Sequence, residues 1–299
     1  VFRAFVIRHQ TVHSQRTLCA IPVLLFSALT LCGAESISYR NDVVPVISKA
    51  GCSSGTCHGN KYGKGGFKIS LRTQDPGLDL IALTRDASAR RINAMEPDQS
   101  LILLKATTQV PHEGGLRFKK DSDEYRILRD WIAQGCRDDV ETAPKLQRIE
   151  VTPDQRVLAE PKGEIQIRAK AFYDKGGVRD ITSLAVYEPA NTLVKVSHDG
   201  LARSDGYGET TVLVRFLTEQ VPVRLAFIPA RPNFKWSKPR ENNYVDKHVF
   251  AKLRSLRMNP SEPCSDTVFA RRAYLDLLGI LPTAHEARAF AMDTRQDKR

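Results

Sequence analysis

The chain has 299 residues, is 41% hydrophobic and carries a formal net charge of +11 at pH 7. The hydrophobic content is that of globular modules, and the length predicts about two domains. The positive charge favours contact with anionic envelope surfaces, acidic polysaccharide or acidic redox partners. Nucleic acid is excluded as a partner, because no basic run is interleaved with aromatic residues.

Residues 1–35 have the pattern of an export signal. Three arginines precede an apolar run over residues 18–31, and small residues at 32–34 offer a cleavage site. We therefore expect a protein exported to the periplasm or cell envelope, without a stable membrane span after cleavage. An uncleaved N-terminal anchor is the alternative, although the apolar run is shorter than the roughly 20 residues of a membrane helix.

The most informative motif is the heptapeptide that begins at Cys52 and ends with Cys57 and His58 (CSSGTCH). Two cysteines followed directly by histidine are typical of covalent haem attachment, in which both thiols bind the vinyl groups and the imidazole ligates iron. The motif therefore predicts one covalent haem c, with His58 as the proximal ligand. The gap between the cysteines is four residues, whereas the common form of the motif has two.

Two other interpretations of this motif remain open. Export places the thiols in an oxidising compartment, so Cys52 and Cys57 could form a disulfide across a tight loop. Alternatively, the two thiols and His58 could ligate zinc, with Cys136 or His112 as a fourth ligand.

A second axial iron ligand is expected from histidine or methionine. The candidates are His112, in a turn flanked by proline and glycines, and Met95, which precedes Glu96-Pro97. We favour His112, because its turn has the rigid backbone that can present a ligand. Met95 is the weaker candidate.

The first segment of the mature chain, residues 36–142, is predicted to be a small all-α cytochrome c-like haem domain. A helix capped by Asn41 or Asp42 leads into the motif, and another is capped within residues 121–124. The second helix has one apolar stripe, made by Tyr125, Leu128, Trp131 and Ile132.

Two further segments follow. Residues 145–229 contain short runs with alternating hydrophobicity between turn signals, which predicts an all-β sandwich. Residues 233–299 predict short helices, one of them with a capping box at Thr283 and Glu286. About 65 residues of short helices have little chance of forming a complete core alone. The expected fold class is therefore multidomain, ending in a short, incomplete helical segment.

Several strings of the first segment resemble the planctomycete-type cytochrome c domain. They are residues 51–60 (GCSSGTCHGN), 63–67 (GKGGF), 90–91 (RR), 97–101 (PDQSL), 111–115 (PHEGG) and 131–132 (WI). The resemblance implies that the wide cysteine spacing is compatible with haem. It also implies that His112, rather than Met95, is the second iron ligand.

The other two segments carry resemblances of their own. Residues 145–229 are similar to bacterial Ig-like domains of group two, on the strings 149–153 (IEVTP) and 199–203 (DGLAR). The tail, with RRAYLD at 271–276, resembles the start of an uncharacterised planctomycete domain that is longer in such proteins. This resemblance implies a truncated domain here. A charged set in the tail could be catalytic or could form a salt-bridge network; it comprises Asp246, Arg271, Arg272 and Asp276.

Together these observations favour an exported c-type haem protein that transfers electrons in the cell envelope to a redox partner that the sequence does not identify. One alternative is an envelope adhesion or scaffold protein whose Ig-like domain binds polysaccharide or protein. The other is the front end of a larger haem-linked periplasmic enzyme. Electron transfer is favoured over a complete enzyme.

Overall fold

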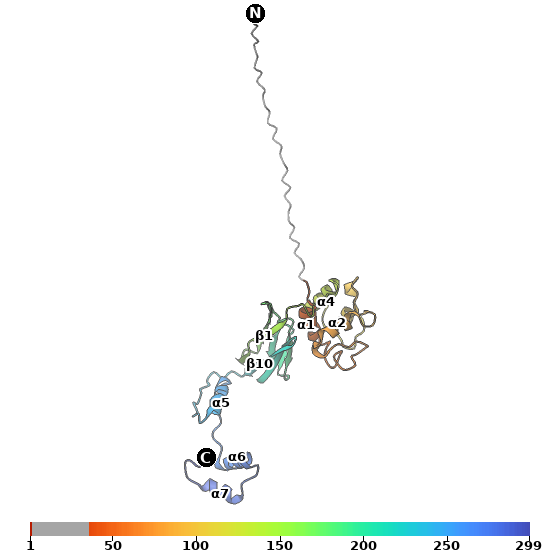
Figure 1. Ribbon diagram of the computed structural model, residues 1–299. Helices are drawn as coiled ribbons and strands as arrows, with labels where there is room; N and C mark the ends of the chain where they lie inside the picture. Colours follow the sequence, from red (N-terminus) through yellow and green to blue (C-terminus); the bar gives the residue numbers. More distant parts are fainter. Residues whose placement is uncertain (2–35) are drawn as a thin grey trace. The chain divides into compact units, whose positions relative to one another are not determined.

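The computed structural model describes Val1 and residues 36–299 (Figure 1). Apart from Val1, the expected export signal lies outside the described residues. Residues Ile37–Arg299 form one compact unit by their contacts. Within the part of the chain that is described, no helix has both the length and the apolar character needed to cross a membrane.

Short helices make up the regular structure of the first segment. They are η1 (Tyr39–Val43), α1 (Val44–Lys49), η2 (Leu71–Thr73), α2 (Pro76–Thr84), η3 (Pro97–Gln99), α3 (Leu101–Ala106) and α4 (Asp123–Ala133). The first helical stretch begins earlier than predicted, because Ser38 caps η1 by accepting a hydrogen bond from the Asn41 backbone N–H. The predicted caps Asn41 and Asp42 lie inside η1 instead.

The prediction of a small all-α cytochrome c-like domain is wrong. The chain is mixed α/β, with short helices in its N-terminal part, a β-sandwich over residues 146–228 and helices at its C-terminal end. Of the described helices before the sandwich, the longest is α4, with 11 residues, and turns or irregular backbone occupy residues 50–70 and 107–122. Glycine is frequent in these stretches and favours turns over helix.

Helix α4 confirms the prediction for its own segment. The Ser122 hydroxyl caps the helix by accepting from the Tyr125 N–H, and Trp131 on the predicted apolar stripe is fully buried. The Trp131 ring lies 5.3 Å from the ring of Tyr39, centroid to centroid. Helix α4 thereby packs against η1, just before the cysteine motif.

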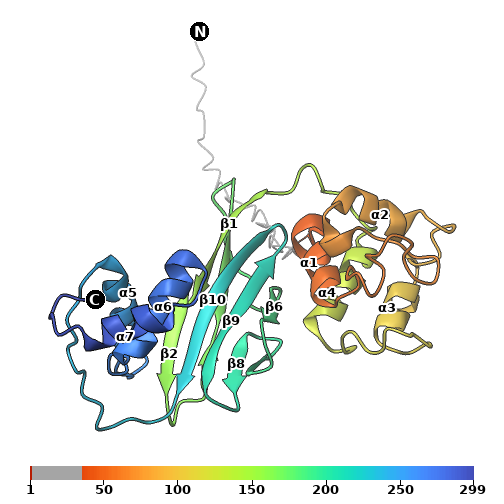
Figure 2. The same cartoon turned by 90° about the horizontal axis from the view of Figure 1, so that it is seen from below.

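The middle segment is built from ten short strands. They are β1 (Leu146–Thr152), β2 (Gln155–Ala159), β3 (Glu164–Gln166), β4 (Arg168–Tyr173), β5 (Val178–Asp180), β6 (Val186–Pro189), β7 (Val194–Val196), β8 (Leu201–Ser204), β9 (Gly208–Phe216) and β10 (Glu219–Ile228). The sheets have the orders β1-β4-β5, β2-β10-β9-β6 and β3-β8-β7, and Figure 2 shows β9 and β10 side by side.

The sandwich core follows from the alternation seen in the sequence. Ala169 and Ala171 on β4 are fully buried, whereas Arg168 and Lys170, which alternate with them, are exposed. Strand β10 pairs with β9 in antiparallel fashion and with β2 in parallel fashion. The parallel pair joins strands about 70 residues apart and is not suggested by the hairpin pattern.

The described C-terminal helices are α5 (Tyr244–Ser255), α6 (Asp266–Leu278) and α7 (Ala284–Met292). The capping box predicted at Thr283 and Glu286 is confirmed, with both of its reciprocal hydrogen bonds present. Among the residues of these three helices, Ala270 alone is buried, and Leu277 is 82% exposed. The tail thus has almost no core within the described chain, as its length suggested.

Helices α1 and α4 also contact loops of the sandwich. The Lys49 ammonium donates hydrogen bonds to the carbonyls of Ser183 (2.5 Å) and His198 (2.8 Å). Glu124, almost fully buried at the start of α4, forms an ion pair with the His198 imidazole. The loop of His198 is therefore attached to both helices.

Candidate cofactor site

The residues between Cys52 and His58 form a closed loop. The His58 backbone N–H donates to the Cys52 carbonyl (3.0 Å), and the Cys57 N–H donates to the Ser54 carbonyl (3.0 Å). Gly59 has no room for a side chain, since a Cβ there would overlap the Ser53 carbonyl. The four-residue gap is thus accommodated by a turn that brings Cys52 next to His58.

This loop forms part of the wall of a cavity of about 460 Å³, within the size range of cofactor pockets. The cavity is lined by Cys52, Cys57, His58 and His112 together. Met95, the weaker candidate for an iron ligand, does not line it, and its side chain is 92% exposed. The structure therefore brings the motif and the Pro-His-Glu-Gly-Gly turn to one site.

The His58 imidazole is fixed by the residues that follow it. Its Nδ1 lies 3.1 Å from the Phe67 carbonyl, and its ring packs against the Phe67 ring with centroids 4.6 Å apart. Because a carbonyl only accepts, Nδ1 carries the proton and Nε2 has a free lone pair. Burial lowers the pKa of His58, which favours the neutral form that a metal ligand requires.

His112 has an equivalent arrangement on its own turn. Its Nδ1 lies 3.0 Å from the Gly115 carbonyl, so Nδ1 is the donor and Nε2 is the nitrogen that the neutral ring offers to a ligand. Gly114 makes this possible, because a Cβ at that position would lie 2.7 Å from the imidazole Cε1. The turn therefore packs its own backbone against the ring and fixes it.

The two imidazoles are arranged as a pair. Their planes are within 10° of parallel, and their ring centroids are 6.4 Å apart. Both rings line the same cavity, so both are accessible to one bound group.

The two thiols have different surroundings. Burial raises the pKa of Cys52 to about 11, and its side chain packs against the hydrophobic core. A hydrogen bond with Ser54 lowers the pKa of Cys57, with Thr56 and Arg117 acting in the same direction. Arg117 lines the cavity, and its buried Nε has no hydrogen-bond partner. An unsatisfied guanidinium nitrogen of this kind is suited to a polar or anionic group of a ligand.

The alternative interpretations can be compared with the same geometry. All four described cysteines have free thiols, so Cys52 and Cys57 are not joined in a disulfide. No cluster of three or more histidine, cysteine or acidic side chains suited to a metal ion occurs among residues 36–299. Of the two proposed fourth zinc ligands, Cys136 donates its backbone N–H to the Trp131 carbonyl and does not line the cavity, whereas His112 does line it.

Sequence reasoning missed three residues that shape the site. Phe67 and Arg117 contact or line the cavity as described above, and Arg91 is a buried cation on its wall. Phe67 and Arg91 belong to strings that carried the family resemblance, which was the available signal. Arg117 follows the His112 turn directly but has no pattern of its own.

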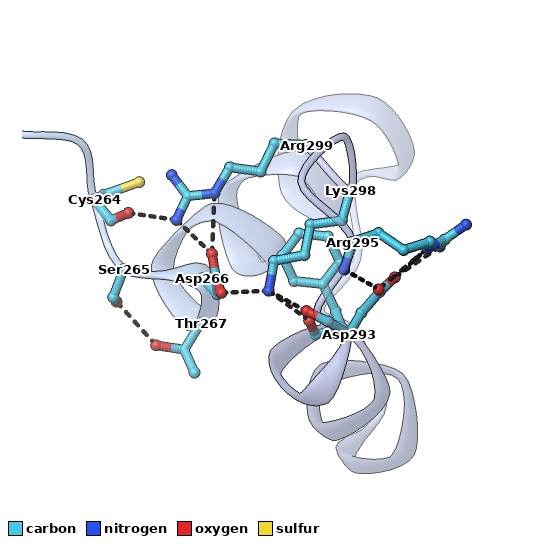
Figure 3. A network of polar contacts seen from close by, with 9 residues as sticks. Cys264, Ser265, Asp266, Thr267, Asp293, Arg295, Lys298 and Arg299 are labelled. Carbon is cyan, nitrogen blue, oxygen red and sulfur yellow. Dashed lines mark hydrogen bonds and ion pairs between the residues drawn. The ribbon is translucent and has the colours of Figure 1, made fainter.

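The structure does not join the charged set of the tail into a salt-bridge network. Among the described residues, no hydrogen bond or ion pair joins Arg271, Arg272 or Asp276 to another side chain. The polar network in this region is instead centred on Asp266, which pairs with Lys298 (2.6 Å) and with Arg299 (Figure 3). These bonds attach the chain end to the start of α6, where an acid also complements the helix dipole.

One family model matches the chain, over residues 244–299, and its description is PSCyt2, a protein of unknown function (DUF1549). The match fits the resemblance of the tail to an uncharacterised planctomycete domain. It covers neither the cavity nor the sandwich. A search of curated proteins found no match.

Among solved structures, the chain is similar to two of the S-layer protein SbsC. A crystal structure of domains 4 and 5 is 18% identical with a TM-score of 0.25, covering 28% of this chain and 53% of that one. A structure of domains 1–6 is 19% identical with a TM-score of 0.26, covering 30% and 14%. This chain therefore spans about half the length of the first of these structures.

Proposed function

We propose that the protein binds one haem c covalently and transfers electrons. Cys52 and Cys57 would each add a thiol across a vinyl group, forming a C–S bond while the thiol hydrogen passes to the other vinyl carbon. His58 and His112 would bind the iron from its two sides through Nε2. When bound, the haem supplies an iron that gains and loses one electron.

One observation carries the proposal: two parallel imidazoles, 6.4 Å apart, share a cavity with both thiols of the motif. In both rings the Nδ1–H donates a hydrogen bond to a backbone carbonyl, which leaves Nε2 as the ligand atom. The sequence resemblance to planctomycete-type cytochrome c proteins supports the same donor residues, although not the fold. Covalent attachment needs this local arrangement rather than a particular fold class.

The number of ligands decides between classes of haem chemistry. Two protein imidazoles leave no open position on the iron, so small molecules such as oxygen have no place to bind. Outer-sphere electron transfer needs no open position. The proposal therefore favours an electron carrier over an enzyme acting on a substrate at the iron. The proposal also includes export of the protein, as predicted from residues 1–35. In it, the sandwich serves as an Ig-like spacer or docking module.

The experiment is expression of the full chain together with a cytochrome c maturation system. A pyridine haemochrome spectrum is then recorded after denaturation, which retains covalent haem alone. We expect a c-type spectrum with one haem per chain, lost in the Cys52→Ala/Cys57→Ala double variant and kept in the control Cys136→Ala. Absence of covalent haem in correctly exported wild-type protein would refute the proposal.

A further inference from the structure

Arg91 is a buried cation in the cavity wall. Its residue is 5% exposed, none of the ion pairs among the described residues includes it, and Asp86 acts on its charge only through a longer-range attraction. Its guanidinium instead donates to three backbone carbonyls, those of Ala82 (2.9 Å), Asp86 (3.1 Å) and Gly66 (2.7 Å). Burying a charge costs free energy unless the charge is well hydrogen-bonded. The three carbonyls meet this cost and hold the guanidinium of Arg91 in one position, which indicates a role in the site.

The contacts of Arg91 lead directly to His58. The guanidinium carbon lies 4.5 Å from the centre of the Phe67 ring, within cation–π range. Arg91 also binds the carbonyl of Gly66, which is the residue just before Phe67. Phe67 in turn contacts His58 twice, through its carbonyl at Nδ1 and through its ring. Arg91 thus holds both the backbone and the side chain of the residue that fixes His58.

On this geometry, and resting on the proposed function, we propose that Arg91 is the positioning residue for His58. It fixes Phe67, so that the imidazole keeps its proton on Nδ1 and presents Nε2 to the cavity. It also places a permanent positive charge beside the site of the iron. A nearby cation favours the reduced iron, so Arg91 raises the reduction potential.

The first test uses the haem-free full chain, produced in cells without a maturation system. The probe is the pair of imidazole ¹⁵N chemical shifts of His58, measured by NMR at a fixed pH at which the ring is neutral. We expect the Nδ1–H tautomer in the wild-type protein and in Arg91→Lys, and a mixture of tautomers in Arg91→Gln. The matched control is Arg85→Gln, because this arginine is exposed and does not line the cavity.

Phe67→Leu provides a second test, which remains informative if Arg91→Gln does not fold. Phe67→Leu removes the ring between Arg91 and His58 but keeps the carbonyl, and we expect a less defined imidazole orientation with the tautomer largely kept. A single, unchanged His58 tautomer and orientation in both Arg91→Gln and Phe67→Leu would overturn the positioning role.

The haem-loaded protein gives an independent readout. The reduction potential should fall in Arg91→Gln, recover in Arg91→Lys and stay unchanged in Arg85→Gln. Equal potentials in Arg91→Gln and Arg85→Gln would overturn the charge effect. If the wild-type protein takes up no haem, the proposed function fails, whereas the tautomer measurement still decides whether Arg91 positions His58.

Discussion

Replacing Glu124 by glutamine should destabilise the protein in a strongly pH-dependent way. The Glu124 side chain is 5% exposed and forms an ion pair with His198, 74 residues away. Burial raises the pKa of Glu124, but the hydrogen bonds from His198 and from its own backbone N–H outweigh burial and bring it to about 2. The ordinary value is 4.5, so the folded state holds the charged form strongly.

The expected magnitude follows from this difference. One pKa unit corresponds to about 1.4 kcal/mol, so a drop from 4.5 to about 2 is equivalent to about 3 kcal/mol of folding free energy. Because the His198 side chain is 50% exposed, solvent screens the pair, and we expect about 2 kcal/mol at neutral pH. Because the pKa of Glu124 is lowered in the folded state, its charge stabilises the folded protein above pH 4.5. This contribution to the folding free energy disappears as the pH falls from 4.5 towards 2.

The assay is urea denaturation at pH 7, 5 and 3, followed by the fluorescence of buried Trp131 in a Trp236→Phe background. The difference between wild type and Glu124→Gln should be about the same at pH 7 and pH 5 and smaller at pH 3, within the range from 4.5 to about 2 in which the carboxylate of Glu124 titrates. The control is Asp123→Asn, whose carboxylate is 55% exposed in a surface pair with Arg126 and should contribute about 0.5 kcal/mol. A pH-independent difference, or equal effects of the two variants, would refute the reasoning.

Three further predictions concern the site, the core and the tail. In haem-loaded protein, His112→Ala should open the iron to carbon monoxide and shift the Soret band, whereas Met95→Leu should change neither; an unchanged spectrum in His112→Ala would remove His112 as a ligand. Trp131→Ala should cost about 3–5 kcal/mol in urea denaturation followed by circular dichroism, because the ring is fully buried. A cost below about 1 kcal/mol would contradict that burial. Thr283→Ala should reduce helicity by removing a cap worth about 1 kcal/mol, while exposed His285→Ala should not; equal helicity would contradict the capping box.

Local features were predictable from the sequence because they depend on neighbouring residues. The caps at Ser122 and Thr283 each use a hydroxyl three residues before the amide that it accepts from. The alternation along β4 follows from one buried face. The closed loop between Cys52 and His58, in contrast, depends on backbone hydrogen bonds that the spacing of the motif does not specify.

Features that depend on the path of the chain were not predictable. Two helices flanking the motif were extrapolated to an all-α domain, although glycine-rich stretches between them form turns instead. The rigid turn of His112 favoured this residue over Met95, but the path of the chain alone determines that this turn reaches the cavity of His58. The ion pair of Glu124 with His198 similarly joins two segments that have no pattern in common.

Peptide mapping by mass spectrometry tests the central claim most directly. Protein from maturation-competent cells is denatured, digested and searched for peptides that carry a haem. The account predicts one haem attached to the peptide that contains both Cys52 and Cys57, with Cys136 and Cys264 unmodified. Haem-free Cys52 and Cys57 in fully exported protein, or haem attached at Cys136, would contradict it.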